Sequence, residues 1–185
     1  MSSVASGRLA GSVRWAVVPY APRPPFRLYA GEGHPPIVVE RAETIIASAR
    51  QAGGEAELTY LVPAKTRPVL ILSETPSEYG EVAALRLLRL SKLSDDKQER
   101  VRRQEDELLF HLPLDRFDLP EESAVMVSAL VRVHVDVVDP GPPLGLIDDT
   151  ESRILGDRII RFYQLDARLV VERRLRELAR RRTER

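Results

Sequence analysis

The chain has 185 residues, 43% of them hydrophobic, which is enough apolar material for one domain with a core of its own. It contains no cysteine, which excludes disulfides, thiol catalysis and thiolate metal sites. The 28 basic and 28 acidic residues cancel, so nucleic-acid binding would have to rest on local patches of charge. The N-terminus lacks the apolar segment of a signal peptide, and no run approaches the ~20 apolar residues that span a bilayer, so we expect a cytoplasmic protein without a membrane segment.

The first half of the chain predicts a tail, a strand, a loop and a helix. Residues 1–11 are expected to form a disordered tail, and the sequence VRWAVVPY at 13–20 predicts a strand. Residues 21–36 are rich in Pro and Gly, which favours an irregular loop. A short helix is expected near 41–52, where apolar residues recur at helical spacing before a Gly-Gly pair.

The second half predicts most of a sheet. A helical excursion is expected near 94–107, within a segment of mixed charge. Further strands are predicted at 57–62, 68–73, 82–91, 108–112 and 124–138. From Asp149, a plausible N-cap, a long C-terminal helix with a basic end is expected over residues 149–185.

This pattern favours a mainly β fold with flanking helices (α+β). The sequence has no internal repeat. It also lacks the alternation of strands with helices that would indicate a parallel sheet. We therefore expect a small, strongly bent antiparallel barrel over residues 12–148, with the helices near 41–52 and 94–107 inserted in it. In this prediction the first half of the C-terminal helix covers the open side of the barrel, and its Arg-rich second half either projects or packs on a second subunit.

Arg67 is the first candidate for a functional residue. It stands with Lys65, Thr66 and Pro68 immediately before an apolar run that ends at Leu72. Proline fits the first position of a strand, where its missing N–H costs no ladder bond, and it biases the preceding residue towards an extended backbone. The guanidinium of Arg67 is thus expected at the lip of a rigid strand, where it either meets an anion or forms a salt bridge at the rim.

The order of several short motifs resembles the PemK/MazF-like toxins. The motifs are GSVRWAVV, KTRPVLILS, LRLLRLSKL and LDRFDLPEESAVMVSALVRVH, followed by a closing helix. The resemblance implies an SH3-like barrel that forms a homodimer and acts as the toxin of a type II toxin-antitoxin system. It further implies cleavage of single-stranded RNA without metal or cofactor, and neutralisation by a small, acidic antitoxin protein. By the same resemblance, Arg67 and Ser91 take the places of the catalytic Arg and the catalytic Thr or Ser.

Metal-free RNA cleavage needs a base for the 2′-hydroxyl, charge stabilisation at phosphorus and an acid for the leaving 5′-oxygen. Arg67 can stabilise charge, and Ser91 can donate a hydrogen bond to the phosphate or bond the local backbone. The missing acid or base points to histidine, and His34 is our first candidate because the loop that holds it overhangs the active site in the resembled family. His111 and His134 lie in predicted strands and are expected to be outward-facing structural residues.

The loop ahead of the predicted helix offers groups for RNA binding. Its cations could hold the RNA backbone, and its aromatic rings could stack bases or pin the loop to the barrel. Together with the two polar residues before Arg67, the predicted RNA-binding residues are Arg23, Phe26, Arg27, Tyr29, Lys65 and Thr66.

A second function remains open at this stage. Where many members of the resembled family have Glu-Gln-x-Arg, this chain has Ser128, Ala129, Leu130 and Val131. Loss of that polar set is expected either in an enzyme of divergent specificity or in a catalytically inactive SH3-like module that binds a protein partner.

Overall fold

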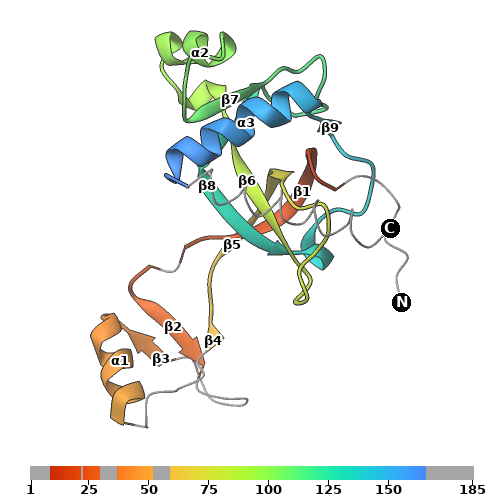
Figure 1. Cartoon of the computed structure of the whole chain (residues 1–185). Helices are drawn as coiled ribbons and strands as arrows, with labels where there is room; N and C mark the ends of the chain where they lie inside the picture. Colours follow the sequence, from red (N-terminus) through yellow and green to blue (C-terminus); the bar gives the residue numbers. More distant parts are fainter. Residues whose placement is uncertain (1–8, 22, 30–36, 52–58, 166–185) are drawn as a thin grey trace, which may run out of the picture. The chain divides into compact units, whose positions relative to one another are not determined.

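The computed structural model describes residues 9–21, 23–29, 37–51 and 59–165 (Figure 1). Three predicted features lie wholly or largely outside these ranges: the tail over 1–11, the catalytic candidate His34 and the basic end of the predicted C-terminal helix. The chain divides into two compact units, one of Met1–Ala16 with Arg67–Arg185 and one of Val17–Thr66. Strands β1 and β5 each pass from one unit to the other.

The larger unit is built on a curled antiparallel sheet of six strands in the order β7-β8-β6-β5-β1-β9. Aliphatic and β-branched residues dominate its strands, as expected for strands with a buried face. The strands are β1 (Ser12–Pro19), β5 (Ala64–Ile71), β6 (Glu81–Arg89), β7 (Leu109–Leu112), β8 (Ser123–His134) and β9 (Gly145–Leu146).

A large irregularity bends the middle of this sheet. The pairing of β6 with β8 passes from Leu85↔Leu130 to Leu87↔Val125, so residues 126–129 of β8 face the single residue Arg86 of β6. Extra residues on one strand bend it and increase the local twist. One half of β8 pairs with β7, and the half beyond Val127 has no described strand on its side away from β6.

Helix α3 (Asp149–Phe162) covers one face of the sheet of the larger unit, over a cluster of buried hydrophobic residues. Leu155 of α3 is 2% exposed and packs with residues of all the long strands. The cluster comprises Val13, Leu70, Leu85, Phe110, Leu112, Phe117, Leu119, Val125, Val127, Ile147 and Leu155. Helix α3 therefore covers the sheet in its first three turns.

The ends of α3 differ from the predicted helix. Asp148, rather than Asp149, is the N-cap, because only from position 148 can Glu151 complete a reciprocal capping box, with bonds of 2.8 and 2.9 Å. The helix ends at Phe162, where Gln164 takes a positive φ of 51° and Leu165 N–H donates to the carbonyl of Ile160. A single helix running on from residue 149 is thus interrupted after Phe162.

A short helix on the other side of β7 forms a second, smaller cluster. Ser94 precedes α2 (Asp95–Arg102), which carries Asp95 and Asp96 in its first turn and basic residues in its last, as the helix dipole favours. Val101 is its one fully buried residue. It packs with Leu90, Leu109 and Ala124, so a highly charged helix is held by a single apolar contact point and by its polar bonds.

The smaller unit contains a second sheet and a helix. The sheet has the order β3-β2-β4, with β2 at Phe26–Tyr29, β3 at Ile37–Val39 and β4 at Thr59–Tyr60. Helix α1 spans Ala42–Gln51. The prediction of an irregular loop over 21–36 is therefore wrong for β2. Phe26 to Tyr29 alternate apolar and polar residues around Leu28, which is 3% exposed, and this strand pattern outweighs the surrounding prolines.

The mainly β class, the antiparallel bent sheet and the helices near 41–52 and 94–107 agree with the sequence-based expectation. Strand ends differ where the chain turns into 3-10 helix. β6 ends at Arg89 instead of residue 91, and β8 ends at His134 instead of 138. None of the helices within the described residues has the length and apolar composition needed to cross a membrane.

Candidate functional site

Arg67 lies inside a strand rather than at its start. β5 begins at Ala64, but its register with β6 runs only from Val69 to Ile71, as expected if Pro68, without an N–H, ends the ladder. Arg67 is half-buried and its Nε atom is buried, whereas Lys65 and Thr66 are exposed. The sheet thus holds the base of the Arg67 side chain and leaves the two preceding polar residues to solvent.

Ser91 has a different setting from the one predicted. It lies in the 3-10 turn Leu90–Lys92 and is exposed, and its hydroxyl donates to Oε2 of Glu121 at 3.0 Å. Arg89 binds Oε1 of the same carboxylate at 2.8 Å. Continuing the register of β5 with β6 puts Arg67 beside Leu88, so Ser91 is offset from it by three residues, or about 10 Å along an extended chain.

The predicted RNA-binding residues all belong to the smaller unit. Arg23 and Arg27 are exposed and Phe26 is half-buried. Arg27 and Phe26 are part of β2, so they are held by a sheet rather than by a loop. Tyr29 ends the same strand. The structure thus brings Arg23, Phe26, Arg27 and Tyr29 onto one segment, with Lys65 and Thr66 at the end of the same unit.

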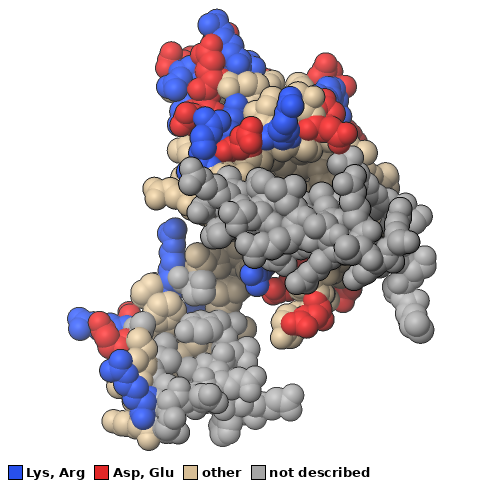
Figure 2. Space-filling view, in the orientation of Figure 1, with Lys and Arg blue, Asp and Glu red and all other residues tan. Residues whose placement is uncertain are grey.

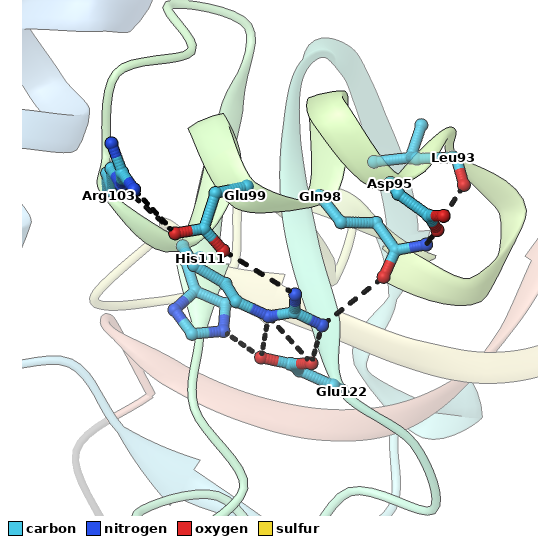
Figure 3. A network of polar contacts seen from close by, with 8 residues as sticks. Leu93, Asp95, Gln98, Glu99, Arg103, His111 and Glu122 are labelled. Carbon is cyan, nitrogen blue, oxygen red and sulfur yellow. Dashed lines mark hydrogen bonds and ion pairs between the residues drawn. The ribbon is translucent and has the colours of Figure 1, made fainter.

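A network of polar contacts lies beside α2 (Figure 3). Arg102 donates from Nε and Nη2 to both oxygens of Glu122, at 2.7 to 3.2 Å, and from Nη2 to Gln98 at 3.2 Å. Nε2 of His111 lies 2.8 Å from Oε1 of Glu122. The hydrogen bond from Arg102, aided by that of His111, lowers the pKa of Glu122 below its ordinary value, against the opposing effect of burial.

This network ties α2 to the turn between β7 and β8. The side chain of His111 is only 13% exposed, so the prediction that it faces outward is wrong: it points under α2 instead. His134 agrees with that prediction, with 48% of its side chain exposed. Because Glu122 is ionised and fully engaged, the network holds a helix in place and leaves no oxygen of Glu122 to act as a base.

Two arginines are almost completely buried, and both bind main-chain carbonyls. Arg158 of α3 is 7% exposed and donates to the carbonyls of Leu109 at 2.9 Å and Gln104 at 2.7 Å. Its burial lowers the pKa of the guanidinium. Arg14 of β1 is 6% exposed and donates to the carbonyl of Asp139 at 3.2 Å and to that of Gly141.

These buried arginines and the Glu122 network are what sequence reasoning missed. The partners of Arg158 lie 49 and 54 residues away, and Glu122 lies 20 residues from Arg102. The Arg-rich composition hides such residues among solvent-exposed ones. The one local signal was the mixed charge of 94–107, which we assigned to a helical excursion without identifying what that helix binds.

The surface around α2 does not form a patch of one sign. Figure 2 shows Lys and Arg interspersed with Asp and Glu over this helix and its surroundings. Within the ranges that the structure describes, no group of three or more His, Asp or Glu side chains is placed to hold a metal ion. A small pocket beside α3 is lined by Glu107, Leu108, Arg158, Arg161 and Phe162.

No protein-family model matches the chain, and no curated protein matches its sequence. The functional assignment therefore rests on the residues described above and on the motif resemblance.

Proposed function

We propose that this chain is a metal-independent endoribonuclease that cleaves single-stranded RNA, as a PemK/MazF-like toxin on an SH3-like barrel. The observation that carries the proposal is the setting of Arg67. It is a half-buried guanidinium on an internal strand of a curled antiparallel sheet, next to Pro68 and preceded by exposed Lys65 and Thr66. A planar guanidinium held in this way suits the two oxygens of a phosphate.

The proposed reaction is attack of the RNA 2′-oxygen on the adjacent phosphorus. The bond from phosphorus to the 2′-oxygen forms and the bond to the 5′-oxygen breaks, while a base takes the 2′-proton and an acid protonates the leaving oxygen. Arg67 stabilises the charge at phosphorus. His34, the acid–base candidate from the sequence, lies outside the described residues. Of the two candidates for phosphate contact, Ser91 has the weaker claim, since its hydroxyl already donates a hydrogen bond to Glu121.

The same setting of Ser91 favours a second candidate function. Its bond to Glu121 and its offset from Arg67 are what a catalytically inactive SH3-like module would have, in which strand-end polar groups serve the fold. Such a module would bind a protein partner and would leave RNA intact.

The proposal includes a homodimer and a small, acidic antitoxin as partners. A dimer contact through the strands and loops around residues 68–91 would need an open strand edge there, but β5 and β6 are both internal strands of the sheet. The described strand with a long open side is β8 from Ser128 to His134, where Leu130 is 47% exposed. Since open edges favour strand pairing, we now place the proposed dimer contact there. Light scattering measures whether the chain is a dimer.

The test of the ribonuclease is cleavage of a mixed single-stranded RNA pool in EDTA by wild type, Arg67→Ala and Arg153→Ala. Arg153 is an exposed arginine of α3 and serves as the matched control. Loss of a contact made mainly in the transition state should lower the rate by about 10²-fold or more in Arg67→Ala only. Uncut RNA with wild type, or equal cleavage by Arg67→Ala, would contradict the mechanism and favour the inactive module.

A further inference from the structure

Arg86 of β6 is half-buried, and it has no partner anywhere in the described structure. Its Nε atom is buried without a hydrogen-bond acceptor. A buried donor left unsatisfied loses its hydration without compensation, which makes such groups rare in folded proteins. The geometry around Arg86 therefore needs an explanation that the fold itself does not give.

Other arginines of the larger unit show how unusual this is. Those that are buried or half-buried, Arg14, Arg67 and Arg158, all take part in interactions within the fold. Within the described part of that unit, the two further arginines without a partner, Arg100 and Arg153, are exposed to water. Arg86 alone combines partial burial with the absence of a partner there.

Arg86 and Arg67 lie on the same face of the sheet. Val69 is the partner of Arg86 in the register of β5 with β6, and paired residues of antiparallel strands point to the same side. Arg67 lies two residues before Val69 on the same strand, so its side chain points to that side as well. Diagonal neighbours of this kind lie about 7–8 Å apart, within reach of long side chains.

No acidic residue of these two strands accompanies the two guanidiniums. Val69 and Ala84, which flank Arg86 on this face, are both fully buried and apolar. Glu81 is the only carboxylate within β5 and β6, and it lies five residues from Arg86 and binds Arg132 at 3.6 Å. Within these two strands, Arg86 therefore has no carboxylate beside it to balance its charge, and a bound anion can supply that balance.

The bulge of β8 lies directly beside Arg86. Four residues, 126–129, face this single position, so Arg86 has no regular partner on β8. Bulges re-aim side chains and are frequent next to functional sites. The bulge leaves Arg86 beside an irregular part of β8, next to Arg67 on the other neighbouring strand.

We propose that Arg67 and Arg86 together form a binding site for one phosphoryl group, in which Arg86 is a second phosphate-binding residue. Two planar forks can hold a tetrahedral oxyanion through several charged hydrogen bonds. If the chain is the ribonuclease proposed above, the phosphoryl group belongs to the RNA backbone. This assignment of the ligand rests on that proposed function.

The test follows the arginine Nε–H signals by ¹⁵N NMR while inorganic phosphate is added at constant ionic strength. Phosphate is expected to shift the signals of Arg67 and Arg86, and Arg86→Met should weaken phosphate binding about tenfold or more, as for loss of charged hydrogen bonds. Arg89→Met is the matched control, because Arg89 lies on the same strand and binds Glu121 in solvent. It should change the affinity by less than about twofold.

A second arm uses single-stranded RNA with methylated 2′-oxygens, which cannot be cleaved. Displacement of phosphate from wild type by this RNA supports an RNA phosphate as the ligand. Phosphate binding that depends on Arg86, without any effect of RNA, keeps the anion site and contradicts the ribonuclease. Equal phosphate binding by wild type and Arg86→Met, or no response of wild type to phosphate, overturns the site.

Discussion

Two regions of the larger unit differ in whether their arginines are bonded within the fold. In the α2 corner, which we define as residues 90–112, 121–123 and Arg158, Arg102 shares Glu122 with His111 and Arg158 binds two carbonyls. On the β5–β6 face, Arg86 binds nothing in the described structure. Buried polar groups that are hydrogen-bonded within the fold stabilise it, whereas a half-buried charged group without a partner is able to bind a ligand.

The largest expected effect concerns the α2 corner, where the arginines are bonded within the fold. Arg158→Met should lower the free energy of unfolding by about 3 kcal/mol, because the carbonyls of Leu109 and Gln104 lose charged donors in a buried site. Urea unfolding measures the change, with Arg153→Met on the exposed side of the same helix as the control. A change of the same size in both variants would mean that the hydrogen bonds of Arg158 contribute nothing to the free energy of unfolding.

A smaller effect is expected at Glu122, and it depends on pH. The pKa of Glu122 is lowered in the folded state, so its contribution is present above the unfolded pKa, near 4.5, and is lost as the pH falls through the folded value. Glu122→Gln should therefore lower stability at neutral pH, by not more than about 1 kcal/mol for a partly exposed pair. This deficit should disappear in strongly acidic solution.

Unfolding in denaturant at neutral and strongly acidic pH measures that difference. Glu105→Gln is the control, because Glu105 is exposed and has no ion pair among the described residues. It should match wild type at both pH values. A deficit of Glu122→Gln that stays constant with pH would show that its charge is not what holds α2.

Local sequence patterns predicted the strands and helices of the larger unit well. The apolar run after Pro68 marks β5, because burial on both faces of a strand demands continuous aliphatic residues. VRWAVV marks β1 through its β-branched and aromatic residues. The helix at 95–102 lies in the segment of mixed charge, with acidic residues in its first turn and basic residues in its last. What failed were positions decided by a contact elsewhere, such as Asp148, which becomes the N-cap because Glu151 closes the box.

The candidate site was harder to predict for the same reason. Arg67 stands out in the sequence because Pro68 and an apolar run follow it directly. Arg86 sits in ALRLLRL, where no local pattern separates it from Arg89, yet one is half-buried and the other binds Glu121 in solvent. Their difference arises from the register with β5 and from the bulge of β8, which sequence periodicity alone does not give.

The smallest expected effect closes the comparison. Arg86→Met keeps the apolar stem and removes a charge that binds no described group, so without phosphate it should not lower the free energy of unfolding by more than about 0.5 kcal/mol. Thermal and urea unfolding in phosphate-free buffer measure this, beside Arg158→Met. If Arg86→Met were as damaging as Arg158→Met, Arg86 would be part of the scaffold like the α2 corner. A near-zero change means that the guanidinium of Arg86 does not contribute to the stability of the fold.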